Sequence, residues 1–143
     1  MDENVGVGVG PAERARHAGG DGPTPEHRCR MSARRKQDAV LRLQQAVQAD
    51  PDYLDARYNF ASALAFTGQF AESARQFEQV VQRRPNDADA EARLGSVLAA
   101  QQDYAAAEAH LRRALSLDPN NQIAKDNLRL LQQVRVQKSS KPQ

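Results

Sequence analysis

Apolar side chains recur along this chain with a fixed period of about 34 residues, a length typical of stacked repeats. Prolines mark the same period, since Pro51, Pro85 and Pro119 are evenly spaced. Within one period the apolar positions have helical spacing in two stretches. A short polar turn separates the stretches, at residues 67–69 and again at 101–103. The pattern therefore predicts antiparallel helical hairpins, with helices near residues 53–66, 70–83, 87–100 and 104–117.

A residue with a short polar side chain follows each of the three prolines. These residues are Asp52, Asn86 and Asn120. An Asp or Asn oxygen can accept a hydrogen bond from a free N–H group in the first turn of a helix. Asp55 and Asp89 would add a favourable negative charge to that turn. We therefore expect the residue after each proline to be the N-cap of the next helix.

The two ends of the periodic region differ from its centre. Thr24, Pro25 and Glu26 are typical of a helix start, and no Gly or Pro follows until Pro51, which predicts one long helix from about residue 25 or 32 to 49. Its later part corresponds to the second helix of an incomplete unit. The first helix of that unit should lie over residues 24–35, but Met31 is the only large apolar residue there. At the other end, residues 121–137 should form a helix with one apolar and one polar face, which closes the stack.

Glycine content separates a tail from the repeats. Six of the 8 glycines lie between Gly6 and Gly22, a stretch with no apolar periodicity. This composition is typical of disorder. The expected organisation is a disordered tail (1–24), a helical domain (25–137) and a disordered basic tail (138–143). Within the domain we expect a leading helix (25–51), a first full repeat (52–87), a second full repeat (88–121) and a capping helix (122–137).

The repeats resemble the tetratricopeptide repeat, a helix-turn-helix unit with the pattern W-x-x-L-G-x-x-Y, then A-x-x-x-F, then P. Leu94-Gly95, Ala107 and Leu111 match this pattern, but Arg57 and Glu91 stand where it has Trp. The resemblance implies an all-α fold: a short right-handed superhelix of antiparallel helix pairs, an α-solenoid with a C-terminal capping helix. It also implies protein binding in a concave groove that the first helix of each pair lines.

Helical geometry assigns a set of residues to that groove, because they lie opposite the packing face of each first helix. The matching residues of the capping helix are Ile123, Asp126, Asn127 and Leu130. The predicted peptide-binding residues are Asp55, Tyr58, Asn59, Ser62, Phe66, Asp89, Arg93, Ser96 and Asn127.

Individual groove residues allow two interpretations. Asn59 and Asn127 could hold a peptide backbone and Arg93 a carboxylate. Alternatively, Asn59 and Arg93 bond neighbouring helices or water, as isolated polar residues on helices commonly do. Exposed Tyr58 and Phe66 favour recognition, although Phe66 could instead fill space left by the missing upstream helix. A carboxylate clamp, the lysine-rich grip of some relatives, is not expected because Asp89 replaces one of its lysines.

The sequence offers no catalytic or metal-binding constellation. A single cysteine, Cys29, excludes a disulfide within the chain and a cysteine-cluster metal site. His17 and His27 lie in or beside the tail, and we expect His110 to face outward without a partner. We therefore expect no enzyme, no metal and no cofactor, but a protein-interaction module or adaptor.

Two alternatives concern other partners. The leading helix would expose Val40, Leu41 and Leu43 to a second chain, so a self-associating scaffold is one of them. Nucleic-acid binding is less favoured, because no aromatic residues accompany the basic cluster Arg28–Lys36. No export signal or membrane-spanning segment is apparent, and we expect a cytoplasmic location.

Overall fold

The computed structural model describes residues 24–140, which form helices and no strand. The all-α prediction is confirmed. Apart from Thr24, the predicted tail over residues 1–24 lies outside the described residues. The helices are α2 (Pro25–Ala49), α3 (Leu54–Phe66), α4 (Phe70–Arg83), α5 (Ala88–Ala100), α6 (Tyr104–Leu117) and α7 (Gln122–Ser140).

The chain forms two units, residues 1–35 and residues 36–143, and the division falls within α2. The sequence places the start of the helical domain at residue 25, and that domain boundary stays a prediction. The side chains from Thr24 to Arg35 are all exposed, and exposed residues add nothing to a packed core. Helix α2 nevertheless begins where the sequence predicts, because the Thr24 hydroxyl accepts a hydrogen bond from the His27 amide at 3.2 Å.

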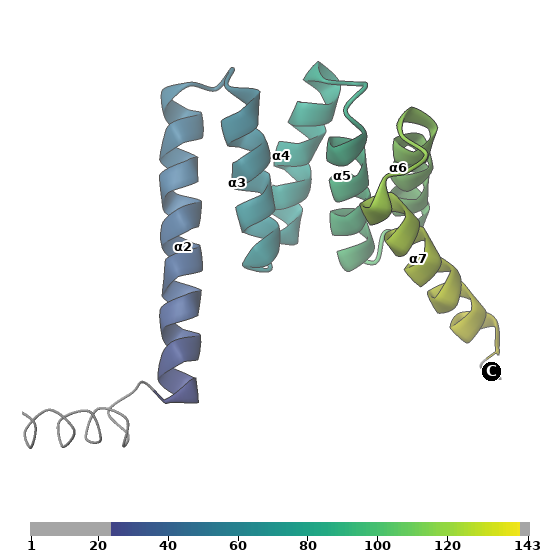
Figure 1. The fold of residues 1–143 in the computed structure, drawn as a ribbon, viewed down its shortest axis with the longest axis horizontal. Coiled ribbons are helices and arrows are strands. Elements are labelled where there is room, and N and C mark those ends of the chain that lie inside the picture. Colours follow the sequence, from purple (N-terminus) through teal and green to yellow (C-terminus); the bar gives the residue numbers. More distant parts are fainter. Residues whose placement is uncertain (1–23, 141–143) are drawn as a thin grey trace, which may run out of the picture. The chain divides into compact units, whose positions relative to one another are not determined.

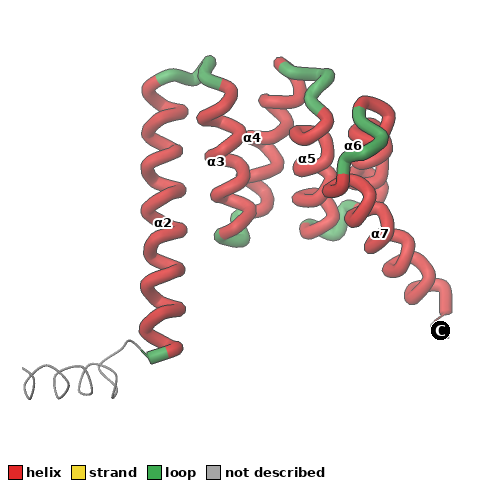
Figure 2. Tube along the Cα trace, in the orientation of Figure 1, coloured by secondary structure: helices red, strands yellow, loops and turns green. Residues whose placement is uncertain are grey.

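Within residues 36–143, α3 and α4 form one antiparallel hairpin, α5 and α6 form a second, and α7 packs on α5 and α6 (Figure 1). Short loops join the helices (Figure 2). The hairpins share a core, since Phe77 from α4 and Leu94 from α5 are both about 1% exposed in one cluster. In this stack α5 therefore lies between α3 and α7, and these three are the first helices of successive pairs.

Close packing inside the second hairpin depends on Gly95. A Cβ atom at this position would lie 2.6 Å from Cγ of Leu111 and 3.1 Å from the carbonyl oxygen of Ala107. Both residues are fully buried in α6. At Gly95, α5 and α6 thus approach too closely for a side chain, which explains the Gly in the repeat pattern.

The N-cap expectation is wrong by one residue. Each proline and the residue after it form a turn. A backbone hydrogen bond closes this turn: the amide of Tyr53, Asp87 or Asn121 donates to the carbonyl oxygen three residues earlier. Proline suits the second position of such a turn. The helices therefore begin one residue later. Asp87 and Asn121 cap α5 and α7 by accepting from Ala90 and Ala124 amides at 3.0 Å, whereas Tyr53 provides no side-chain cap.

Helix α7 continues to Ser140, so the predicted basic tail begins too early. The hydroxyls of Ser139 and Ser140 donate to the carbonyl oxygens of Val136 and Gln137, which completes the last helical turn. Lys138 also lies over the Tyr104 ring, 5.1 Å from its centroid. These contacts extend the helix beyond the last apolar position, where hydrophobic patterning gives no signal.

The apolar face of α2 does not remain free. Val40 and Val47 are buried against Phe60 and Leu64 of α3, and Leu43 packs on the same cluster. The sequence had assigned Val40 and Leu43 to an exposed self-association surface. Of the three residues in that surface only Leu41 is exposed, because α3 covers the side that the others occupy.

None of the helices in the described part of the chain is long and apolar enough to cross a lipid bilayer.

Candidate peptide-binding site

A pocket of about 370 Å³ opens between the first helices of the repeats. Four predicted groove residues line it: Ser62 and Phe66 from α3, and Arg93 and Ser96 from α5. Most of the remaining wall is apolar. The repeat brings these residues together because Ser62 and Ser96 occupy equivalent positions in successive units.

Phe66 is the most exposed large apolar side chain in the described part of the chain, at 74% relative exposure. It is the last residue of α3 and forms one wall of the pocket. Burying an aromatic ring is a large favourable term at protein interfaces. A ring left in water at the rim of a pocket is therefore a candidate anchor for a partner.

The two serines use their hydroxyl protons inside their own helices. Ser62 donates to the carbonyl oxygen of Tyr58 at 3.1 Å, and Ser96 donates to that of Ala92 at 2.9 Å. Each hydroxyl oxygen retains acceptor capacity. The serines could thus accept a hydrogen bond from a peptide N–H group, while their small size keeps the pocket open.

Arg93 is held by Tyr58 across the two first helices. Its Nε donates a hydrogen bond to the Tyr58 hydroxyl, and its guanidinium carbon lies 5.6 Å from the centroid of the tyrosine ring. The Tyr58 ring in turn packs edge-on against Phe77, with centroids 5.5 Å apart and an interplanar angle of 81°. Arg93 therefore bonds a neighbouring helix, as the simpler of the two interpretations expected, while still lining the pocket.

Tyr58 is half-buried, although the sequence placed it on the exposed face. Burial raises the pKa of its phenol above the ordinary value of 10.0, and the neighbouring Arg93 charge opposes this rise. The phenol is thus neutral at physiological pH. It serves as a fixed hydrogen-bond partner for Arg93.

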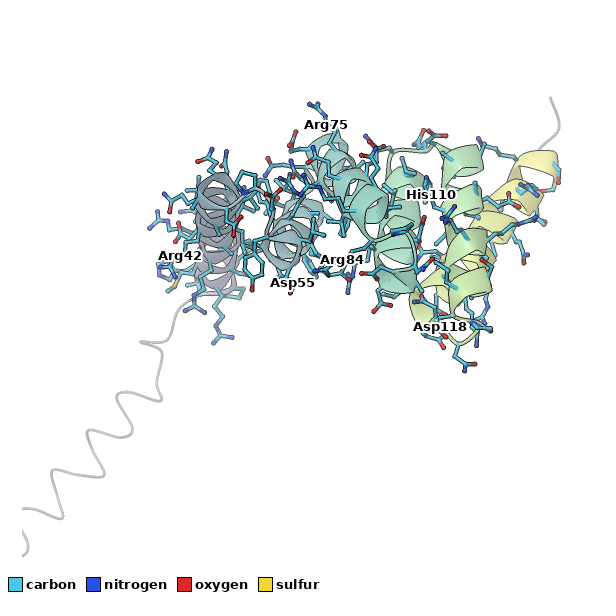
Figure 3. All side chains as sticks on the ribbon, turned by 90° about the horizontal axis from the view of Figure 1, so that it is seen from above. Arg42, Asp55, Arg75, Arg84, His110 and Asp118 are labelled. Atoms are coloured by element: carbon cyan, nitrogen blue, oxygen red, sulfur yellow. The ribbon has the colours of Figure 1, made fainter. Side chains whose placement is uncertain are left out.

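The other predicted site residues lie outside the pocket lining, and most are engaged. Asp55 forms an ion pair with Arg84 at 2.8 Å (Figure 3). Asp89 accepts a hydrogen bond from Nδ2 of Asn121 at 2.7 Å. Asn127 donates a hydrogen bond to the carbonyl oxygen of Ile123 at 2.8 Å. Asn59 is exposed and makes no side-chain hydrogen bond to the residues that the structure describes. Their place in a peptide-binding groove stays a prediction.

Four lining residues are absent from the predicted set: Ala65, Phe77, Val97 and Ile123. Ile123 follows Asp89 by one period and Asp55 by two, so the period places it on the groove face. Phe77 is only 1% exposed and belongs to the core, yet it also lines the pocket. Small apolar residues such as Ala65 carry no sequence signal that separates a pocket wall from ordinary packing.

A second polar cluster lies where the repeat pattern has tryptophan. The Glu91 carboxylate is 1% exposed and contacts His110 Nδ1 at 2.8 Å and Arg113 Nε at 2.9 Å. The expectation that His110 faces outward without a partner is wrong, because its ring turns toward this buried carboxylate of the neighbouring helix. In the first repeat, Arg57 donates to Gln76 at 2.6 Å and to the Pro51 carbonyl oxygen at 2.9 Å.

In residues 24–140, no group of three or more His, Cys, Asp or Glu side chains is arranged to hold a metal ion.

Comparison with protein families matches residues 58–122 to the tetratricopeptide repeat. A search of curated proteins finds no significant match.

Several solved structures are similar in fold. One is YrrB, which is described as a tetratricopeptide repeat protein with an unusual peptide-binding site. Its structure matches this chain with a TM-score of 0.64 and 26% sequence identity, and the match covers 69% of this chain. This chain spans about half of YrrB, 51% of its length. The first tetratricopeptide domain of human RPAP3 has a TM-score of 0.66 at 26% identity, with 74% of this chain and 84% of that domain covered.

The corresponding domain of Spaghetti (RPAP3), solved with the HSP90 peptide SRMEEVD, has a TM-score of 0.67 at 25% identity. Here too the similarity covers 74% of this chain and 84% of the other.

Proposed function

This chain belongs to the tetratricopeptide repeat family through residues 58–122, and on that premise we propose that it is a protein-interaction module. It binds a peptide segment of a partner protein along the first helices α3, α5 and α7. The observation that carries the proposal is the pocket between these helices, with the exposed Phe66 ring at its wall and Arg93 beside it.

Two similar structures support a peptide as the ligand. YrrB is described as having a peptide-binding site, and the Spaghetti domain was solved with a bound peptide. We do not propose the HSP90 peptide itself as a ligand of this chain. Asp89 carries a carboxylate that Asn121 already holds, and an acid at this position disfavours a grip on a terminal carboxylate.

The self-association alternative has less support than peptide binding. It relied on Val40, Leu41 and Leu43, and two of these three pack on α3. A single exposed leucine offers far less apolar area than a stable interface buries.

The test begins with a displayed library of random peptides, selected on the full chain. Selected peptides are titrated against the chain while amide chemical shifts are recorded by NMR. We expect the largest shift changes in α3, α5 and the start of α7. Phe66→Ala should weaken binding about tenfold or more, because it removes an aromatic anchor.

Leu41→Ala is the matched control, since Leu41 is also exposed, at 56%, but lies on α2. It should leave the affinity unchanged. The proposal fails if the library yields no binding peptide, or if selected peptides bind Phe66→Ala as tightly as the unchanged chain.

A further inference from the structure

One face of α2 is open, although the equivalent faces of the other second helices are covered. The equivalent residues of α4 and α6 are each at most 1% exposed: Ser73, Phe77, Val80, Ala107, Leu111 and Ala114. On α2 the same positions are Ala39, which is exposed, and Leu43 and Ala46, which are only partly buried. Helix α3 covers the neighbouring side of α2, where Val40 and Val47 lie.

The open face, formed by Ala39, Leu43 and Ala46, is the side of a second helix on which the first helix of the same pair would pack. The sequence assigned that first helix to residues 24–35, but α2 already runs as one helix from Pro25 to Ala49. We propose that a helix from another protein docks on the open face and completes the pair. This site is separate from the pocket at α3, α5 and α7, so the inference does not depend on the proposed function.

The open face has the same residues at the same spacing as the face of α6 that holds α5: Ala39, Leu43 and Ala46 correspond to Ala107, Leu111 and Ala114. On α6 this surface accepts a helix only where that helix has no side chain, because a Cβ atom at Gly95 would lie 2.6 Å from Leu111. A helix that docks on α2 therefore needs a glycine or another small residue opposite Leu43.

Arg42 indicates an acidic residue in the docking helix. In both full repeats, the equivalent side chain of the second helix bonds the first helix at the tryptophan position: Gln76 contacts Arg57 at 2.6 Å, and His110 contacts Glu91 at 2.8 Å. Arg42 is exposed at this position (Figure 3). It forms no ion pair with any residue that the structure describes. A glutamate on the docking helix would supply the partner, as Glu91 does on α5.

Together these requirements define a sequence pattern for the partner, and α5 shows it. Glu91 is followed four residues later by Gly95 and seven residues later by Leu98, and these positions share one face of a helix. Leu98 belongs to the same core cluster as Ala107, the counterpart of Ala39. The partner helix should thus carry an acid, then a small residue four positions later and a large apolar residue seven positions later.

A second copy of this chain fits the open face less well than such a partner. Helix α7 is the first helix of its own pair, and no second helix follows it in the described residues. At the positions of Glu91 and Gly95, however, α7 has Lys125 and Arg129. The lysine would repel Arg42, and the arginine would stand where only a small residue fits.

A synthetic peptide of residues 87–101 tests the inference, because it has the required pattern and carries three acids and one base. It is titrated into the full chain while amide chemical shifts are recorded by NMR. We expect the largest shift changes around Ala39, Leu43 and Ala46. Ala39→Arg should weaken binding about tenfold or more, since a long charged side chain there obstructs the helix without entering the core. Gln37→Arg is the matched control, because it adds the same charge on the opposite side of α2, and it should leave the affinity unchanged.

Two changes to the peptide test the pattern itself. Gly95→Leu in the peptide should weaken binding about tenfold or more, because the added side chain meets Leu43. Glu91→Gln in the peptide should weaken binding severalfold at low salt, and Arg42→Gln in the chain should remove this difference. Phe66→Ala in the chain should leave the affinity unchanged, because Phe66 lines the separate pocket.

Four outcomes would overturn the inference. The first is a peptide that does not bind, and the second is a peptide that binds Ala39→Arg as tightly as the unchanged chain. Loss of binding in Phe66→Ala would place the peptide in the pocket instead. Finally, the occupant would be wrong if sedimentation shows a dimer that Ala39→Arg abolishes, which assigns the face to a second copy, or if the peptide binds only after residues 1–23 are removed, which assigns it to that segment.

Discussion

Glu91 is a carboxylate with almost no contact with water, at a position where the repeat pattern has tryptophan. Removing a charge from water is costly unless partners replace the lost hydration. His110 and Arg113 supply those partners at 2.8 and 2.9 Å, and both stay partly exposed, with side chains 33% and 55% accessible. The cost of burial therefore falls mainly on the carboxylate.

This asymmetry predicts that Glu91 and its partners respond differently to substitution. Replacing both His110 and Arg113 with alanine should lower the free energy of unfolding by about 1–3 kcal/mol, because the buried carboxylate loses its partners. Glu91→Met should be neutral or stabilising, because an apolar side chain of similar size removes the buried charge. Urea denaturation at neutral pH gives both values. A larger loss for Glu91→Met than for the double variant would contradict this account.

The sequence placed Arg57 and Glu91 at the tryptophan position of the repeat pattern, and both are buried. It did not identify their partners. Gln76 and His110 lie 19 residues further along the chain, on second helices. Which of several long polar side chains reaches across depends on side-chain rotamers, and no periodicity encodes them. The hydrogen bond between Arg93 and Tyr58 was not predicted for the same reason.

At the scale of elements, the two hairpin turns share a backbone conformation but differ in sequence. Gly68 has φ of 82°, and Gln102, at the equivalent position of the next turn, has φ of 68°. This left-handed region suits glycine, whereas a residue with a Cβ atom incurs a steric cost there. The second turn is therefore strained at Gln102, and the first is not strained at Gly68.

Exchanging the residues of the two turns should have opposite effects. Gly68→Gln should lower stability by about 1 kcal/mol, since it introduces the steric cost. Gln102→Gly should raise stability by a smaller amount, because the relief of strain is partly offset by the greater freedom of glycine in the unfolded chain. Thermal unfolding monitored by circular dichroism measures both. Shifts of the same sign would show that backbone conformation does not govern these turns.

Helix positions were largely predictable from sequence, because proline and the turn residues 67–69 and 101–103 interrupt a regular pattern. The observed α4 and α6 have the predicted bounds. The predicted helix ends were wrong where local hydrogen bonds, and not the apolar pattern, decide where the helix begins or ends. The turn at each proline extends one residue beyond the expected cap, and α7 continues on hydrogen bonds from Ser139 and Ser140.

At the scale of the whole molecule, stability depends on each hairpin covering the next. Helix α7 packs on α5 and α6, where it covers Ala92, Leu111 and Ala114. Its own Ala124 is fully buried in the same cluster. In repeat arrays such neighbour contacts supply much of the stability.

Deleting residues 122–143 should therefore destabilise the second repeat strongly. The loss should be about 3 kcal/mol or more, since Leu128, Leu131 and Ala124 no longer shield the cluster. Deleting only residues 138–143 is the control. It removes the exposed contact of Lys138 with Tyr104 and should cost less than about 1 kcal/mol. Equal urea midpoints for the two truncations would mean that α7 does not contribute to the core.

Helix α7 has a second role besides covering the core. Ile123 lies in its first turn and lines the pocket. Among the described helices, α7 contacts only α5 and α6, so it can detach without disturbing the first hairpin. Every detached molecule lacks one wall of the pocket, and the apparent dissociation constant rises as the docked fraction falls. By linkage, a bound peptide must also hold α7 in place. Slower amide hydrogen exchange along α7 would thus report a bound partner even at residues of α7 that lie outside the pocket lining.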